Sequence, residues 1–256
     1  MKTKSTNHLI AIVGGSGAGK TWLADQLQQA LGPEACRLSL DNFYRDRSHL
    51  PPARREQINF DHPRAIDWPC LERVLKDCRA GRATHLPHYN FTSHTRLHTD
   101  LPYRPKTLVI VDGLWLLRRP AVRRLFDLRI FLDCPAELRL RRRLARDARE
   151  RGRSHASVRR QFQATVAPMH VRYVTPQAAW ADVVLKQPLQ GAEIGQWAER
   201  LRKEFLLMRL HDSLQDWRRF SLSHPTRRAG APSQRVGEGR VRVCLDFVQP
   251  TPRRAK

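Results

Sequence analysis

The 256-residue sequence has no long hydrophobic run. Its most apolar stretch, residues 108–117, is too short to cross a bilayer and is interrupted by Asp112. The N-terminal sequence MKTKSTNH is followed by only five apolar residues before a glycine-rich loop, which is too few for the hydrophobic core of a secretory signal. We therefore expect a cytoplasmic protein that does not enter a membrane.

Cysteine is scarce as well. The five cysteines are widely separated, and none of them forms a CxxC pair: Cys36, Cys70, Cys78, Cys134 and Cys244. This spacing gives little support to a zinc site or a disulfide framework. Reduced thiols are the plain expectation for a cytoplasmic protein.

Acidic residues are few in comparison with basic ones. The chain has 24 Asp and Glu against 47 Lys and Arg, of which 8 are lysine, so its formal net charge is +23. Such a charge attracts anions, whether nucleotide phosphates, RNA or lipid headgroups. The basic residues are spread along the whole chain, which favours a genome rich in arginine codons. Nucleic acid stays open as a partner but is not favoured.

Strand-like and helix-like segments alternate through most of the chain. This pattern predicts an α/β fold in which a mostly parallel sheet is flanked by helices. Residues 84–98, rich in aromatic residues, Thr and His, predict an exposed hairpin or an excursion at the sheet edge. We expect strands at 8–13, 36–40, 107–111, 128–132 and 181–185, and helices at 20–31, 67–79, 136–151 and 154–166.

The pattern becomes weaker after residue 186, so we expect a domain over residues 1–186 and a C-terminal extension over 187–256. Apolar residues at helical spacing predict a helix over 192–208 that packs on the core. Residues 225–240, rich in Pro, Gly, Ser and Arg, predict a flexible linker, and residues 240–248 predict a late strand.

The sequence GGSGAGKT at residues 14–21 matches the pattern G-x-x-x-x-G-K-[ST] between a predicted strand and a predicted helix. The glycines let backbone N–H groups surround phosphates, and the helix adds its positive N-terminal end. We therefore expect a P-loop NTPase fold that binds ATP or GTP with Mg²⁺, Lys20 reaching the β- and γ-phosphates and the Thr21 hydroxyl binding the metal. The predicted phosphate-binding residues are Gly14, Gly15, Ser16, Gly17, Ala18, Gly19, Lys20 and Thr21.

Asp112 ends a predicted central strand, at the sheet edge where open α/β sheets bind ligands. A carboxylate at this point can hold Mg²⁺ directly or through water. The pair Asp112-Gly113 is also typical of a turn or a helix cap. We favour the metal site because of the phosphate loop.

A phosphate loop alone does not separate kinases from GTPases, motors or helicases. Asp41 follows the second predicted strand, which places a carboxylate beside the γ-phosphate, where it can accept the proton of an attacking hydroxyl. Asp61 suits paired sugar hydroxyls, and Tyr89 and His94 suit a flat base. Each of these residues alone is equally well explained as a turn, cap or surface-hairpin residue.

The densest basic cluster lies at residues 136–153, which contain eight arginines. Arginine forks suit phosphate oxygens and the charge of a transferring phosphoryl group, so this segment predicts an arginine-rich lid. At helical spacing only four of these arginines share one side: Arg139, Arg142, Arg143 and Arg146. The others are explained by a solvated helix face.

Taken together and in this order, the motifs resemble the uridine kinase family of the phosphoribulokinase/uridine kinase group. The resemblance covers about residues 8–185 and includes the P-loop, DNFY at 41–44, NFDHP at 59–63, the hairpin segment 86–96, DGL at 112–114 and the segments around 146–153 and Gln161. It implies ATP-dependent phosphorylation of the 5′-hydroxyl of uridine or cytidine, as in pyrimidine salvage. It also implies a nucleoside-binding β-hairpin, an arginine-rich lid and a homo-oligomer.

The resemblance implies roles for residues of the acceptor site. Asp41 is expected to be the general base and a magnesium contact. Asp61 is expected to hold the ribose 2′ and 3′ hydroxyls, with Tyr44 lining the same pocket. Tyr89 and His94 are expected to recognise the pyrimidine ring.

The resemblance also assigns residues of the lid. Arg143, Arg146 and Arg151 match positions that close over the triphosphate, and Arg146 and Arg151 join Lys20 and Asp41 as expected catalytic residues. Arg153 and Gln161 are expected to hold the nucleoside from the other side.

Two positions and the C-terminal extension depart from the family pattern. Asp112 stands where the family usually has glutamate, and Trp22 stands where a small or hydroxylated residue is common. Two alternatives therefore stay open. One is a related P-loop kinase for another small alcohol, such as pantothenate or a sugar phosphate, because Arg64, Arg96 and the lid could supply the cations that a phosphorylated acceptor needs. The other is a basic RNA-associated protein with a kinase-like fold.

Overall fold

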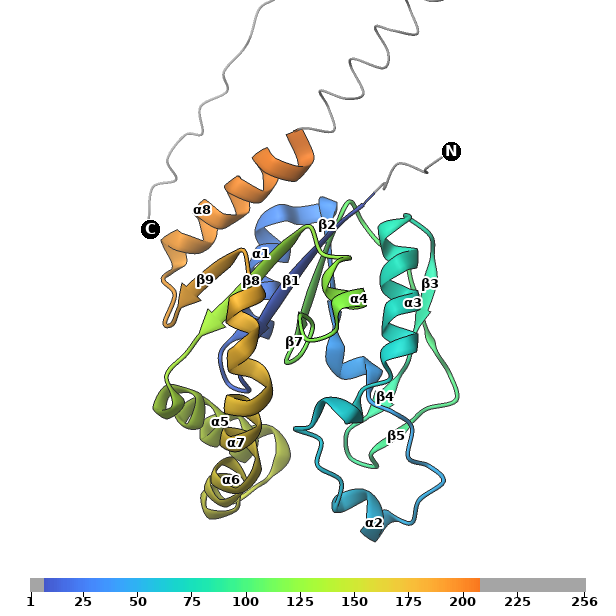
Figure 1. Cartoon of the computed structure of the whole chain (residues 1–256), viewed down its shortest axis with the longest axis vertical. Helices are drawn as coiled ribbons and strands as arrows, with labels where there is room; N and C mark the ends of the chain where they lie inside the picture. Colours follow the sequence, from blue (N-terminus) through green and yellow to red (C-terminus); the bar gives the residue numbers. More distant parts are fainter. Residues whose placement is uncertain (1–6, 208–256) are drawn as a thin grey trace, which may run out of the picture. The chain divides into compact units, whose positions relative to one another are not determined.

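A computed structural model describes residues 7–207, and its centre is a parallel sheet of five strands in the order β2-β7-β1-β8-β9 (Figure 1). All four neighbouring pairs run parallel. The strands are β1 (His8–Gly14), β2 (Ala35–Ser39), β7 (Leu108–Gly113), β8 (Leu128–Asp133) and β9 (Val183–Lys186). The predicted α/β fold is confirmed, and each predicted strand is present with its bounds shifted by at most two residues.

The sheet is covered on both faces, which explains the continuous apolar runs of β1 and β7. Because strand side chains alternate, Ile10 and Ile12 join one core while Leu9 and Val13 join the other. The first core contains α1 (Lys20–Leu31) and α8 (Gly191–Leu201), and the second contains α3 (Trp68–Arg79) and α4 (Pro120–Arg123).

The helix predicted over 192–208 is α8, continued by a wider turn at Arg202–Leu207. Its residues Ile194, Ala198, Leu201 and Phe205 are buried in the same core as α1, so its apolar side is core, as predicted. The predicted linker at 225–240 and the predicted strand at 240–248 lie outside the described residues, as does Met208.

A long helical segment follows β8 at the carboxyl edge of the sheet. It comprises α5 (Ala136–Arg151), α6 (His155–Gln161), wide turns at Phe162–Val166 and His170–Val174 around α7 (Ala167–Met169), and a tight turn at Thr175–Trp180. The predicted end at residue 166 was therefore wrong. Pro168 lies between the two wide turns, whose altered hydrogen bonding accommodates a residue without a backbone N–H.

The predicted hairpin region contains two short antiparallel ladders instead of one. β3 (Thr84–Leu86) pairs with β6 (Leu101–Tyr103), and β4 (Tyr89–Asn90) pairs with β5 (Thr95–Arg96). The remaining elements are α2 (Pro52–Glu56) and tight turns at Gly32–Glu34, Leu40–Phe43 and Pro63–Ala65. In Figure 1, α5 and α6 lie on one side beyond the carboxyl ends of the strands, and α2, β4 and β5 lie on the other. Within residues 7–207, no helix is long and apolar enough to cross a membrane.

Candidate active site

The P-loop connects β1 to α1, and its conformation requires glycine. Gly17 and Gly19 have φ values of 82° and 92°, in the left-handed region that suits glycine. A Cβ atom at Gly17 would lie 2.5 Å from the carbonyl oxygen of Arg139. The loop is closed by Lys20, whose Nζ donates to the Gly15 carbonyl at 3.0 Å. Its backbone is thus folded as a phosphate-binding loop.

Charged groups of both signs surround Lys20. Burial lowers the pKa of Lys20, and Arg146 and Arg139 add to this effect, while Asp112 and Asp41 oppose it. The charges of the predicted carboxylates and of one predicted lid arginine, Arg146, thus reach the P-loop lysine.

Asp112 is buried at the end of β7 and is held by two donors. The Thr21 hydroxyl donates to its Oδ2 at 3.0 Å, and Arg37 Nε donates to its Oδ1 at 2.9 Å. Arg37 on β2 also contacts Asp25 at 2.7 Å. Among the described helices, none has Asp112 as its cap, so the turn or cap explanation loses support.

The neighbouring oxygens of Thr21 and Asp112 fit Mg²⁺, which prefers oxygen ligands. Among the side chains that the structure describes, no group of three or more His, Cys, Asp or Glu residues could hold a metal. Mg²⁺ at phosphate-transferring sites takes one or two protein oxygens besides the substrate phosphates, and Thr21 and Asp112 would supply these.

Asp41 lies in the turn Leu40–Phe43 that follows β2, and its backbone N–H donates to Ser39 Oγ at 3.3 Å. Its side chain is open to water, yet the protein atoms around it raise the pKa of Asp41. Asp112 raises it further, whereas Lys20 and Arg151 lower it. Asp41 thus lies within electrostatic reach of the P-loop lysine.

Aromatic side chains form a cluster beside Asp41. The Tyr44 ring lies 5.2 Å from that of Tyr89, and the Phe60 ring stacks on His94 at 4.4 Å with an angle of 19° between the rings. The Tyr44 hydroxyl donates to the Phe60 carbonyl at 3.3 Å. Tyr44, Tyr89 and His94 are therefore brought together, with Phe60 as a member that the sequence did not single out.

His94 lies in the loop of the β4–β5 hairpin with a φ of 55°. Residues other than glycine adopt this left-handed conformation rarely, and such positions cluster at binding sites. The unusual backbone conformation at His94 is therefore consistent with a binding role for the hairpin loop.

Asp61 faces the helical segment across the pocket. Its Oδ2 accepts a hydrogen bond from the Thr165 hydroxyl at 3.3 Å. Burial raises the pKa of Asp61, opposed first by Arg143 and then by the Thr165 hydrogen bond. Asp61 therefore lies between the aromatic cluster and the arginines of the lid.

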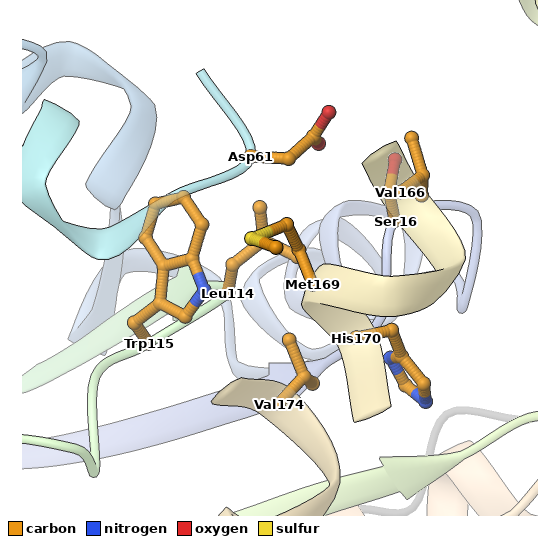
Figure 2. Close-up of a pocket in the computed structure, with 8 residues that line it drawn as sticks. All are labelled: Ser16, Asp61, Leu114, Trp115, Val166, Met169, His170 and Val174. Carbon is orange, nitrogen blue, oxygen red and sulfur yellow. The ribbon is translucent and has the colours of Figure 1, made fainter. Parts of the chain in front are cut away.

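Figure 2 shows a small pocket between these segments and the P-loop, lined by Ser16, Asp61, Leu114, Trp115, Val166, Met169, His170 and Val174. The Met169 side chain extends toward Leu114 and Trp115 in this view, and the His170 ring lies on the other side of the helix. Ser16 and Asp61 line the same pocket, so the phosphate loop and the acceptor segment face each other.

Two arginines of the predicted lid, Arg143 and Arg153, bind the same glutamine, and Arg143 also contacts the P-loop. Arg143 is buried and donates from Nη1 to Ser16 Oγ at 2.5 Å and from Nη2 to Gln161 Oε1 at 3.0 Å. Arg153 donates to the same Gln161 oxygen at 2.6 Å. Gln161 therefore joins the predicted triphosphate side and the predicted nucleoside side of the lid.

Asp147 is a central residue of the lid that sequence reasoning did not assign. Its carboxylate is fully buried and lies 2.7 Å from Arg146, 3.5 Å from Arg143 and 3.7 Å from Arg151. All three of these predicted lid arginines thus share one counter-ion. The sequence signal was a single acid inside the basic helix.

Arg139 and Arg142 also contact the P-loop, as their helical spacing with Arg143 predicts. Arg142 Nη1 donates to the Ala18 carbonyl at 3.1 Å, and a Cβ atom at Gly15 would lie 2.9 Å from Arg139 Nη1. His170 packs on the same point of the loop, 2.7 Å from that Cβ position. Burial and the charges of Arg139 and Lys20 lower its pKa to about 4, and no sequence pattern singled it out.

Comparison with known proteins identifies the family. Residues 9–190 match the model of the phosphoribulokinase/uridine kinase family, which is more than half of the chain. The chain belongs to this family. It is therefore a kinase, and the resemblance drawn from its motifs is confirmed.

Two curated relatives of this kinase are uridine kinases. The protein from Staphylococcus haemolyticus is 39% identical over 180 residues, which are 70% of this chain and 87% of that protein. The protein from Staphylococcus aureus is 38% identical over the same length and shares of the two chains. The solved structure of phosphoribulokinase from Rhodobacter spheroides has the same fold, with a TM-score of 0.54, 18% identity, and 72% of this chain and 71% of that chain covered.

Proposed function

We propose that this kinase transfers the γ-phosphoryl group of ATP to the 5′-hydroxyl of a pyrimidine ribonucleoside, uridine or cytidine. The names of its relatives support this substrate class. The observation that carries the proposal is the position of Tyr44. Burial raises the pKa of Tyr44 well above its ordinary value, and Asp41, Asp61 and Tyr89 raise it further. The Tyr44 ring also lies 5.2 Å from that of Tyr89, so the expected ring-binding tyrosine contacts Tyr44, and the charges of the expected base and sugar-binding carboxylate reach it.

In this proposal Asp41 accepts the proton of the 5′-hydroxyl. A raised pKa makes a carboxylate a stronger base, which suits proton transfer near neutral pH. Asp61 accepts hydrogen bonds from the 2′ and 3′ hydroxyls of the ribose. Tyr89, His94 and Phe60 provide the ring surfaces for the pyrimidine, with Arg153 and Gln161 closing the pocket from the lid.

On the phosphate side, the backbone N–H groups of residues 14–21 and Lys20 hold the triphosphate. Thr21 and Asp112, with Asp41 beside them, would hold Mg²⁺, which neutralises charge on the phosphates when bound. Arg143, Arg146 and Arg151 present guanidinium forks to the transferring group, and Asp147 is the counter-ion that all three share. Acceleration then comes from positioning and charge stabilisation.

A phosphorylated acceptor is less well supported than a nucleoside. Such a substrate needs extra cations at the pocket, for which Arg64, Arg96 and the lid arginines are the candidates. Arg96 is instead bound to Asp67 at 3.1 Å and to the Tyr44 carbonyl at 2.9 Å, where it fastens the hairpin to the loop after β2. We also propose that the enzyme is a cytoplasmic homo-oligomer of pyrimidine salvage, with residues 187–256 as its C-terminal extension.

An assay of ADP release tests the substrate class. The enzyme is supplied with ATP, Mg²⁺ and one acceptor at a time: uridine, cytidine, adenosine, pantothenate or ribulose 5-phosphate. We expect turnover with uridine, cytidine or both, at least tenfold above each of the others. Faster turnover of pantothenate or ribulose 5-phosphate would overturn the proposal.

A further inference from the structure

A second strongly basic surface lies outside the P-loop and the acceptor pocket. It is a groove with a volume of about 850 Å³, and six of its ten lining residues are arginines: Arg45, Arg47, Arg64, Arg118, Arg119 and Arg172. No Asp or Glu among the described residues lines it. Like charges gathered in a concave surface focus a positive potential there.

No ion pair between an arginine of this groove and an acidic side chain occurs among the side chains that the structure describes. Arg79 and Arg129, by contrast, pair with Asp127 at 2.8 Å and with Asp182 at 2.5 Å. The charge of Arg119 contributes to lowering the pKa of Glu72, but the Glu72 carboxylate is paired with Lys76 at 2.8 Å. The groove therefore keeps its charge available to a ligand.

Aromatic rings hold three of these arginines in place. The guanidinium carbons of Arg118 and Arg172 lie 4.6 Å and 5.2 Å from the ring centroid of Tyr173. The guanidinium carbon of Arg119 lies 5.6 Å from the ring centroid of Trp68. Such contacts position a guanidinium without neutralising it.

The rings themselves are fixed in turn. The Tyr173 hydroxyl lies 2.9 Å from Nε2 of His62, and Trp68 Nε1 donates to the Pro63 carbonyl at 2.9 Å. Burial lowers the pKa of His62, and the charges of Arg64, Arg172 and Arg118 lower it further. The positive charges of these arginines therefore act on His62, which lines the groove.

We propose that this groove binds an anion with several phosphate groups, either the triphosphate of a nucleotide or a free oligophosphate. Arginine forks match phosphate oxygens, and the volume suits a ligand of this size. The ring faces of Tyr173 and Trp68 are covered by arginine side chains, so the phosphates are the recognised part. This site is additional to the P-loop and independent of the acceptor's identity.

Calorimetry on the full chain tests this proposal with inorganic tripolyphosphate as the probe. The P-loop is first saturated with a non-hydrolysable ATP analogue and Mg²⁺. We expect tripolyphosphate to bind with one further equivalent. The double variant Arg118→Gln/Arg172→Gln should weaken this binding at least tenfold, and the control Arg104→Gln/Arg141→Gln, which removes the same charge at exposed positions, less than twofold.

Several outcomes would overturn the proposal. They are the absence of a second equivalent, an equal loss in the control variant, or a groove that binds single-stranded RNA but not tripolyphosphate. If the first variant unfolds, Arg64→Gln/Arg119→Gln replaces it with the same expectation. A parallel titration with UTP distinguishes the two ligands. If UTP and tripolyphosphate bind with equal affinity, the groove recognises a free oligophosphate. If UTP binds more tightly and the groove variant abolishes this binding, the groove recognises a nucleotide.

Discussion

Arg37 and Asp112 form an ion pair at 2.9 Å between adjacent strands of the sheet, directly beside the Thr21 hydroxyl. The pair occupies one oxygen of the carboxylate that is expected to face Mg²⁺. Arg37 thus fixes the short Asp112 side chain, and it also competes with a metal for its charge.

Removing this competition should strengthen magnesium binding. We expect Arg37→Gln to lower the Mg²⁺ concentration for half-maximal activity about fivefold, since an ion pair of this kind contributes about 1 kcal/mol. The same shift should appear when Mg²⁺ tightens the binding of an ATP analogue in calorimetry. Arg129→Gln, on β8 and paired with Asp182, is the control. An unchanged magnesium dependence would show that the pair has no influence on the metal.

Asp41→Asn tests the general base. The amide keeps the size of the side chain but accepts a proton poorly, so turnover should fall by a factor on the order of 10² or more. The affinity for an ATP analogue should stay within about twofold of the wild-type value, because the P-loop is intact. Unchanged turnover would remove Asp41 from this role.

The pH dependence of turnover should follow the same carboxyl group. Since the pKa of Asp41 is raised, the base becomes protonated, and activity falls, at a higher pH than for an aspartate with the ordinary pKa of about 4. Measuring kcat between pH 4.5 and pH 8 should show this acidic limb in the wild type and none in Asp41→Asn. A limb that persists in the variant would assign the titration to another group, with Asp61 as the next candidate because its pKa is raised as well.

The sugar specificity depends on Asp61. If its carboxylate holds both ribose hydroxyls, 2′-deoxyuridine loses one charge-assisted hydrogen bond, and kcat/KM should fall about 10- to 100-fold relative to uridine. In Asp61→Asn the difference between the two nucleosides should shrink. Equal rates for both in the wild type would contradict the contact.

Asp147 should be important for stability as well as for the lid. Asp147→Ala leaves three arginines around a buried position without their counter-ion, so we expect a loss of about 3 kcal/mol in the free energy of unfolding. Urea denaturation monitored by circular dichroism measures this loss. Glu150→Gln, an exposed acid on the same helix, should change stability by less than about 0.5 kcal/mol. A similar small effect for Asp147→Ala would refute the role.

The sequence was sufficient for features that depend on local pattern. The strands, the helix 136–151 and the P-loop follow from apolar runs, helical spacing and glycine positions, and Asp112 follows from its place at a strand end. Arg37 could not be recognised, because its partner is 75 positions away and depends on strand order. Asp147 and His170 were missed for a similar reason: Asp147 belongs to the site through its burial and His170 through its packing on the P-loop, and neither follows from residue type.

The packing of α8 also determines how far the chain can be shortened. Ile194, Ala198, Leu201 and Phe205 cover the apolar side of α1, the helix that begins at the P-loop lysine, Lys20. A protein that ends at residue 186 would expose this surface to water and would be prone to aggregate, although every residue assigned to ATP and nucleoside lies before that point. Expression of an active fragment therefore requires residues through 207.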